Sequence, residues 1–348
     1  MTAASLAIIL PSIFLVLITF LPLIRLDCWQ FRIFDYPRVQ KLFLLLVLAA
    51  CWLIIGITDT ADWICFGSII VAAGYLVFVI YPYTPFAPKM IGSIKKEGRT
   101  TVRVLTCNVY QENSNFEKVL QLISNVSPDI VFLVEVDYKW IAAMQPLYKS
   151  YPERIEIPKS NTYGMALYSR LPIDRQQINY LIDDNIPSID ISVTVDGKAV
   201  RIFGLHPTPP VPQENDSSTE RDAEILLVGK KVSTIAEPCM VIGDLNDVAW
   251  SYTTSLFLKT SHLLDPRRGR GFYNTFHAKW AFMRWPLDHF FVSRHFGLVG
   301  LTVHRSVGSD HFPICIEVAF SDDAFADPEY ADHAEKELAQ EKIKDGLK

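Results

Sequence analysis

Apolar residues fill three long and almost unbroken blocks near the start of the chain. The blocks cover residues 6–24, 42–58 and 63–81, and the second and third contain no charged residue. Each is close to the roughly 20 residues that a helix needs to cross a hydrocarbon core about 30 Å thick. A helix buried in a soluble protein is seldom so continuously apolar, so the pattern predicts three transmembrane helices within residues 1–83. The first block lacks a basic segment before it and a small-residue cleavage site after it, which favours a retained helix over a signal peptide.

Lysine and arginine lie in the segments that follow the first and third blocks. The turn 59–62 holds none, whereas each of the two segments holds four, namely Arg25, Arg32, Arg38 and Lys41, then Lys89, Lys95, Lys96 and Arg99. Loops rich in lysine and arginine stay on the cytoplasmic side of a membrane. The sequence therefore predicts a multi-pass protein of the cell membrane, with its N-terminus outside and its soluble part in the cytoplasm.

Two further segments flank the soluble part. Residues 84–100 are interrupted by prolines and glycines, which predicts a short linker that tethers the following domain near the bilayer. Residues 321–348 are charged and rich in alanine, glutamate and lysine. This composition predicts a solvated helix or a disordered tail.

Residues 101–320 alternate short apolar runs with amphipathic stretches, which is typical of strands and helices. Helices are expected at 115–125, 220–235 and 250–259, and strands at 102–109, 129–136, 164–169, 189–195, 199–205, 239–242, 288–292, 300–303 and 314–320. Asp196-Gly197 between two of these strands is a strong hairpin signal, so an all-parallel sheet is excluded. The pattern predicts an α/β (α+β) domain in which two mixed sheets pack together with helices outside.

Composition excludes some classes of protein. Half of the residues are hydrophobic, only 20% are charged, and the formal net charge is -5, so a strongly basic nucleic-acid binder is not indicated. The six cysteines occur singly, without a CxxC pair. Neither a zinc site nor a disulfide scaffold is therefore expected, and no feature indicates a protein partner.

Polar residues suited to acid–base chemistry or metal binding recur where the predicted strands end. In chain order they are Asn108, Glu135, His206, Asp244, Asn246, Asp288, Asp310 and His311. Taken singly, each is explained equally well as a loop cap or a hydrogen-bonded side chain. Glu135 is less easily explained, because it lies in an apolar run where an unpaired carboxylate is costly. Since α/β sheets commonly keep their chemistry at strand ends, the recurrence favours one shared site.

Seven short motifs carry these residues, namely TCNVY, VFLVEVD, GMALYSRLPI, GLHPTPP, VIGDLND, PLDHFFVS and GSDHFPI. Together, and in this order over residues 101–320, they resemble the endonuclease/exonuclease/phosphatase superfamily. The resemblance implies a four-layer α/β/β/α sandwich and hydrolysis of phosphate esters that depends on Mg²⁺ or Mn²⁺. With three apolar blocks before it, the chain is similar to a bacterial membrane-anchored branch of that superfamily.

The resemblance also implies roles for the polar residues. Glu135 with Asn108 would bind the cation, in keeping with the preference of Mg²⁺ for oxygen ligands, and Asp310 would support the metal side. Asp244 would orient or deprotonate the attacking water, and Asn246 would hold that water or a phosphoryl oxygen.

The histidines and the remaining aspartate complete the implied site. His206 and His311 would donate hydrogen bonds to the phosphorus centre, and Asp288 would orient His311 and keep it protonated. His289, beside Asp288, is expected to be structural. His206-Pro207-Thr208 stands where abasic-site nucleases of the exonuclease III type have a tyrosine followed by Pro-Asn, which argues against abasic-site repair.

Basic residues outside these motifs are candidates for substrate binding. Arg268 belongs to a local basic cluster that would grip a polyanion or else lie on a solvated loop, and the cluster comprises Arg267, Arg268 and Arg270 with Lys279 and Arg284. Arg221 would reach a phosphate or else form a salt bridge on a helix surface. The arginine cluster favours a nucleic-acid substrate, our first hypothesis, whereas the acidity and the membrane tether favour a phospholipid or phosphoinositide. A non-catalytic membrane-bound interaction module is the third hypothesis, against which the complete set of polar residues argues.

Overall fold

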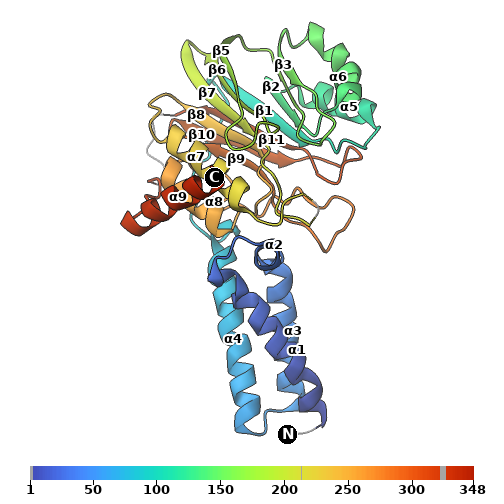
Figure 1. Ribbon diagram of the computed structural model, residues 1–348, viewed down its shortest axis with the longest axis vertical. Coiled ribbons are helices and arrows are strands. Elements are labelled where there is room, and N and C mark those ends of the chain that lie inside the picture. Colours follow the sequence, from blue (N-terminus) through green and yellow to red (C-terminus); the bar gives the residue numbers. More distant parts are fainter. Residues whose placement is uncertain (1–2, 213, 322–326) are drawn as a thin grey trace.

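The computed structural model describes residues 3–212, 214–321 and 327–348 of the 348-residue chain. Three long helices form a stalk, and a two-sheet sandwich stands on one end of it (Figure 1). The stalk helices are α1 (Ala3–Phe20), α3 (Arg38–Ile55) and α4 (Thr60–Ile80). In the described part of the chain, these helices are the three that are long and apolar enough to cross a membrane, over Ala7–Ile24, Arg38–Ile55 and Thr60–Tyr83.

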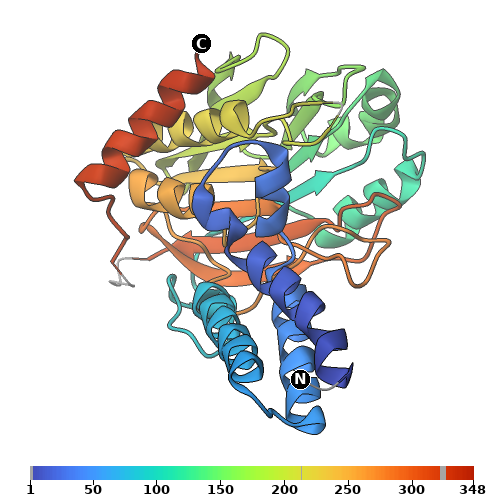
Figure 2. The ribbon, with the colours of Figure 1, turned by 60° about the horizontal axis from the view of Figure 1, so that its bottom comes forward.

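The segment between α1 and α3 does not run free. It forms a 3-10 turn (Leu21–Ile24), the short helix α2 (Trp29–Arg32) and a second turn (Ile33–Asp35). Figure 2 shows this blue segment lying across the underside of the sandwich. Its backbone bonds the domain directly, because the Trp29 amide donates to the Asp216 carbonyl and the Ser218 amide to the Asp27 carbonyl.

Within the described residues, eleven strands form the two mixed sheets that the sequence predicts. One sheet has the order β10-β11-β1-β2-β4-β3 and the other the order β5-β6-β7-β8-β9. Most neighbours are antiparallel, but β1 pairs with β2, and β7 with β8, in parallel. The strands are β1 (Thr101–Asn108), β2 (Ile130–Val134), β3 (Glu153–Ile157), β4 (Met165–Ser169), β5 (Ile173–Asn179), β6 (Ser188–Val195), β7 (Lys198–Leu205), β8 (Cys239–Asp244), β9 (Asp288–Val292), β10 (Phe296–Val303) and β11 (Ile314–Phe320).

Helices cover the outer face of each sheet, which completes the expected α/β/β/α sandwich (Figure 1). The alternation of side chains along buried strands builds these layers. In β2, Phe132 and Val134 face the opposite sheet, whereas Val131 and Leu133 face the outer helices. The helices are α5 (Phe116–Val126) and α6 (Tyr138–Met144) on the first sheet, and α7 (Thr219–Val232), α8 (Tyr252–Ser261) and α9 (His333–Gly346) on the second.

The predicted linker, residues 84–100, packs along the domain. Met90 and Ile91 belong to the core between the sheets. The Ile94 amide donates to the Leu298 carbonyl, and the Leu298 amide donates to the Gly92 carbonyl, each at 2.9 Å. Proline and glycine break regular structure in this segment, but its apolar side chains still bury themselves against the domain.

The described part of the tail forms a helix, one of the two expected alternatives, but this helix is not wholly solvated. α9 begins with a capping box between Asp332 and Glu335, and its Ala339 and Ile343 join the apolar cluster under the second sheet. Lys342 is buried and donates to both Asp27 and Asp222. The high charge of the segment conceals this packing, because one face of the helix is apolar and Lys342 forms ion pairs with the domain and the segment before α3.

Candidate active site

The candidate residues lie where strands of both sheets end. Asn108 closes β1, and Glu135 follows β2, its parallel neighbour. His206 follows β7, and Asp244 closes β8, which pairs in parallel with β7. Asp288 opens the antiparallel strand β9 directly opposite Asp244. Parallel neighbours end at the same edge of a sheet, which is why these residues converge.

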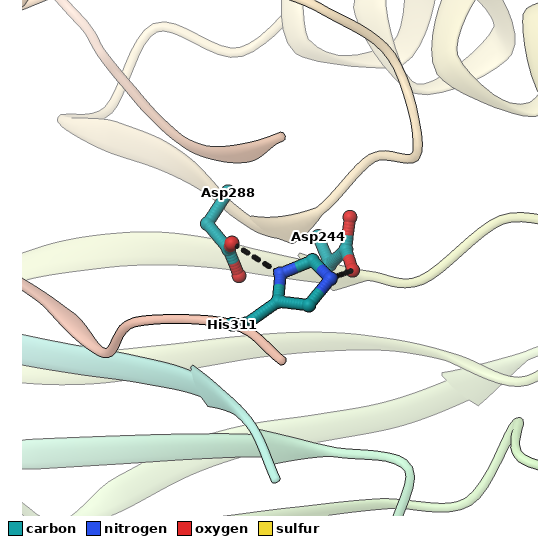
Figure 3. Close-up of side chains that lie close together, drawn as sticks. All are labelled: Asp244, Asp288 and His311. Carbon is teal, nitrogen blue, oxygen red and sulfur yellow. Dashed lines mark hydrogen bonds and ion pairs between the residues drawn. The ribbon is translucent and has the colours of Figure 1, made fainter. Parts of the chain in front are cut away.

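His311 lies between two carboxylates at the centre of the site (Figure 3). Its Nδ1 is 2.8 Å from Asp288 Oδ2, and its Nε2 is 3.4 Å from Asp244 Oδ2. Burial lowers the pKa of this imidazole, but Asp244 and Asp288 outweigh that effect and raise it to about 10. The imidazolium is therefore the stable form at neutral pH, as the sequence predicts for an aspartate-oriented histidine.

Asn108 connects the two sheets. Its amide nitrogen donates to Glu135 Oε1 at 2.8 Å and to Asp244 Oδ2 at 3.0 Å. With the contact between Asp244 and His311, a continuous chain of polar contacts joins Glu135 to His311, and each contact is 3.4 Å or shorter. The side chains that the sequence places in one site are thus brought together.

The surroundings of Glu135 fit a divalent cation. Burial raises the pKa of this carboxyl to about 7, although bonds from Asn108 and from the Gln111 amide oppose the rise. Among the described residues, no lysine or arginine forms an ion pair with Glu135, Asp244, Asp288 or Asp310. The single imidazolium of His311 does not balance four carboxyl groups, and the remaining negative charge is costly unless a further cation offsets it.

Two sets of residues could hold that cation. Ligand atoms of Asp244, Asp288 and His311 lie within 4.8 Å of one another. His311, however, already bonds Asp288 and is protonated at neutral pH, and a metal ligand must offer a neutral imidazole. We therefore favour the side of Glu135, where the Asn108 amide would have to turn its oxygen toward the ion.

His206 and Asn246 border Asp244. His206 Nε2 is 4.0 Å from Asp244 Oδ2, and burial lowers the pKa of this imidazole to about 4, so it is neutral. Its Nδ1 is buried and has no hydrogen-bond partner within the described chain. The Asn246 amide donates to Asp244 Oδ1, and the Asn246 side chain donates to the Pro207 carbonyl.

The backbone around these residues adopts conformations that side chains rarely favour. Gly243, directly before Asp244, has φ +133°, and a Cβ there would lie 2.0 Å from the Leu205 carbonyl oxygen. Glu135 and Asn246 have φ 62° and 51° without being glycine. Such conformations cost about 1–3 kcal/mol each and concentrate at functional sites, where the surrounding structure maintains them.

A loop between β8 and β9 forms another wall of the site. The Phe276 ring lies 4.9 Å from the His311 ring, and the Ala278 amide donates to the Asp310 carbonyl. The Asp310 carboxylate accepts from Ser309 Oγ, and its charge raises the pKa of both Glu135 and His311.

The structure places the two candidate arginines outside the reach of a substrate. Arg221 is buried, donates to Asp222 and to the Asn246 carbonyl, and supports the site from behind. Arg268 pairs with Glu329 and lies over the Tyr83 ring, at the junction with α4. Both assignments to substrate binding were wrong, because sequence alone does not reveal the partners that occupy a buried guanidinium.

The arginine cluster around Arg268 is also structural. Arg267 is buried against Asp265 and His289, which confirms that His289 is structural. Arg270 donates to the Ile91 carbonyl and to Ser93 Oγ, so it fixes the segment that leads into the domain. Neither a polyanion grip nor a solvated loop describes these side chains.

Three supporting residues were not predicted. Tyr36, from the segment before α3, donates its hydroxyl to the Asn246 carbonyl at 2.8 Å. Asp247 accepts from Ser251 and Thr254 and fixes the start of α8. The Gln111 amide donates to Glu135. Asp247 lies inside the motif VIGDLND, so the sequence could have indicated its role. Tyr36 lies in none of the motifs, so nothing in the sequence indicated its contact.

Comparison with known proteins finds one matching family model and several solved structures with a similar fold. A model of the Endonuclease/Exonuclease/phosphatase family matches residues 105–311. Similar solved structures include D. rerio TDP2 complexed with single strand DNA product, an endonuclease/exonuclease/phosphatase family protein from Bacteroides thetaiotaomicron, and a functionally unknown conserved protein from Enterococcus faecalis V583. No curated protein matches the sequence.

The three structures share the sandwich but little sequence. Their identities to this chain are 15%, 18% and 14%, with TM-scores of 0.53, 0.52 and 0.51. The alignments cover 63%, 64% and 63% of this chain and 98%, 99% and 100% of theirs. At such identities the likeness establishes the fold alone.

Proposed function

Because the chain belongs to the Endonuclease/Exonuclease/phosphatase family, we propose that it is a membrane-anchored phosphodiesterase that requires Mg²⁺ or Mn²⁺. Members of this family are metal-dependent hydrolases of phosphoester bonds. The observation that carries the proposal is the chain of contacts from Glu135 through Asn108 and Asp244 to His311. It joins a carboxylate suited to a cation with a carboxylate and an imidazolium suited to proton transfer.

Each residue has a role that follows from its surroundings. Glu135, with Asn108 and Asp310 nearby, would hold the cation, whose charge offsets that of the phosphoryl oxygens and the leaving group. Burial raises the pKa of Asp244, which makes its carboxylate a stronger base toward an attacking water. His311, protonated and oriented by Asp288, would donate to a phosphoryl oxygen as its negative charge grows.

Two neighbours would hold the substrate beside these groups. The neutral His206 has a buried Nδ1 without a partner and an Nε2 that faces Asp244. It can donate one hydrogen bond to a phosphoryl oxygen. Asn246 would orient the attacking water through Asp244, which its backbone amide contacts.

The buried arginines weaken the case for nucleic acid as the substrate relative to a phospholipid. Nucleic acid was favoured by Arg267, Arg268 and Arg270, but each is engaged with the protein itself. The contact of Tyr36 with Asn246 instead brings the site close to the stalk. These observations favour a phospholipid head group, and nucleic acid becomes the alternative that the experiment must test.

The three apolar helices support a membrane location, and the uneven distribution of lysine and arginine favours a cytoplasmic catalytic domain. Arg32, Arg38 and Lys41 are buried among protein partners, so their charges also serve the fold. A reporter fused after Lys348 that is active outside the cytoplasm would contradict this orientation.

The full chain, purified in detergent, should hydrolyse a phosphodiester in the presence of Mg²⁺ or Mn²⁺. The test offers plasmid DNA, RNA and phospholipid vesicles in parallel, with and without a chelator. Chelation is expected to abolish the reaction, and added Mg²⁺ to restore it, because the carboxylates of the site and the phosphate are all negative and need the charge of the cation between them. Failure to hydrolyse any of the three substrates would leave the non-catalytic interaction module as the better description.

Replacing Asp288 by asparagine should change the pH dependence of turnover. Burial lowers the pKa of His311, and the two aspartates raise it to about 10, so its charge persists below that pH and is lost as the pH rises through it. Removal of one carboxylate lowers this pKa by about 1 unit or more. As the pH rises, wild-type turnover of a soluble diester should stay constant to about pH 9. Turnover by Asp288→Asn should begin to fall at a lower pH than that. If turnover of Asp288→Asn fell at the same alkaline pH as that of the wild type, this role for Asp288 would be contradicted.

A further inference from the structure

An apolar loop is exposed between Phe276 and β9. Residues 279–283 are all exposed, and three of them are large and apolar. The exposed fractions are 63% for Trp280, 89% for Phe282 and 50% for Met283. Single exposed apolar side chains are ordinary, but a contiguous exposed group marks a surface that contacts a partner or a membrane.

The loop lies at the level where the stalk meets the domain. The Phe282 carbonyl accepts a hydrogen bond of 2.7 Å from the Gln40 side chain, in the first turn of α3. Trp285, at the end of the loop, packs edge-on against Tyr36 with ring centroids 5.7 Å apart. Apolar side chains from other elements at this level are also exposed, namely Ile24, Ile33, Tyr81 and Phe86.

The same loop is part of the active site. Phe276, just before the exposed residues, contacts the His311 ring, and the Ala278 amide bonds the Asp310 carbonyl. Trp285 also stacks on Phe276 with centroids 5.9 Å apart. Any surface that holds the tip of this loop is therefore brought close to the active site.

We propose that the loop of residues 277–285 inserts Trp280, Phe282 and Met283 into the bilayer surface and holds the active site against it. The bilayer is the occupant that fits, because α3 begins beside Phe282 and carries the chain into the membrane. Lys279 is exposed beside the apolar tip, and a long basic side chain reaches phosphate head groups from such a position. On the proposed function, the substrate is then the phosphodiester of a phospholipid head group in that bilayer.

Insertion is measured by fluorescence quenching in vesicles that contain the full chain. The vesicles are made of phosphatidylcholine, either unlabelled or brominated on the acyl chains. Subtracting the emission of Trp280→Phe from that of the wild type isolates Trp280 from the six other tryptophans. The Trp280 emission should be blue-shifted and quenched by the brominated lipid. Emission at the wavelength of a water-exposed indole, without quenching, would overturn the proposal.

Hydrolysis tests the consequence for substrate access. The double variant Trp280→Ser with Phe282→Ser should retain turnover of soluble bis(p-nitrophenyl) phosphate but lose about tenfold on vesicle phospholipid, since two inserted aromatics no longer hold the site. Tyr138→Ser is the matched control, because Tyr138 is 73% exposed on α6, at the end of the sandwich away from the stalk (Figure 1). It should change neither rate.

The possible outcomes separate this inference from the proposed function. Equal losses on both substrates, or none on vesicles, would overturn the role of the loop. Hydrolysis of DNA but not of phospholipid would overturn the substrate class. A wild-type chain that hydrolyses nothing would overturn the proposed function and the substrate class together, whereas quenching of Trp280 decides insertion without any hydrolysis.

Discussion

Replacing Asp244 or His311 by alanine is expected to lower turnover by about 10³-fold or more, because each change removes a proton-transfer or charge-stabilising group. Asp244→Ala removes the contacts of this carboxylate with both Asn108 and His311. The chain of polar contacts from Glu135 to His311 is then broken. His311→Ala removes the one imidazolium among the carboxyl groups. Turnover with Mg²⁺ on the substrate found to be active is the measurement.

Thermal unfolding and circular dichroism of the same variants separate chemistry from folding. Both variants should keep the wild-type spectrum, since the apolar layers on either side of the site are untouched. His333→Ala is the matched histidine control, because its side chain is 89% exposed at the start of α9. Full activity in either site variant, or loss of the folded spectrum, would contradict the catalytic assignment.

Asp222→Ala should cause the largest loss of stability of any single change proposed for this chain. The buried Asp222 carboxylate accepts from Arg32 at 2.9 Å, Arg221 at 2.7 Å and Lys342 at 3.1 Å. Burial alone would raise its pKa, but the three cations hold it well below its ordinary value. Removal of one partner from a buried ion network typically costs about 3–5 kcal/mol, because the remaining charges stay buried without compensation.

The network also joins three segments that are distant along the chain. Its loss should therefore loosen the attachment of these segments to one another. Arg32 belongs to α2, Asp222 to α7 and Lys342 to α9. Chemical denaturation followed by circular dichroism should give a lower midpoint, and limited proteolysis should remove α9 earlier than in the wild type. Asp345→Ala, on the exposed face of α9, is the control and should leave the midpoint unchanged. A wild-type midpoint in Asp222→Ala would show that the buried charges do not stabilise the junction.

The site residues at strand ends could be predicted because the apolar runs of the sequence locate the strands, and these residues lie where the runs end. Asn108, Glu135, Asp244 and Asp288 each adjoin an apolar run that becomes a buried strand, and parallel pairing brings the ends together. The two-sheet sandwich followed from the alternation of runs and from the hairpin at Asp196-Gly197, whose residues have the positive φ values of 51° and 71°. Local pattern and motif order were enough for these features.

Charged residues outside the strands could not be assigned in the same way. Arg221, Arg268 and Lys342 read as surface cations, since a sequence does not reveal a partner that is distant along the chain. Their distant partners in the structure are the Asn246 carbonyl, Glu329 and Asp27, and the last is 315 positions from its lysine. Tyr36 was missed for the same reason, because its contact with Asn246 depends on how the stalk meets the domain.

Mn²⁺ binding to the wild type and to Glu135→Gln tests the central claim most directly. The substitution keeps the size of the side chain and removes the charge that would hold the cation. Titration of the full chain, followed by electron paramagnetic resonance of the free ion, should show Mn²⁺ bound to the wild type and little or none bound to Glu135→Gln. Equal binding by both chains, or no binding by the wild type, would contradict a metal site centred on Glu135.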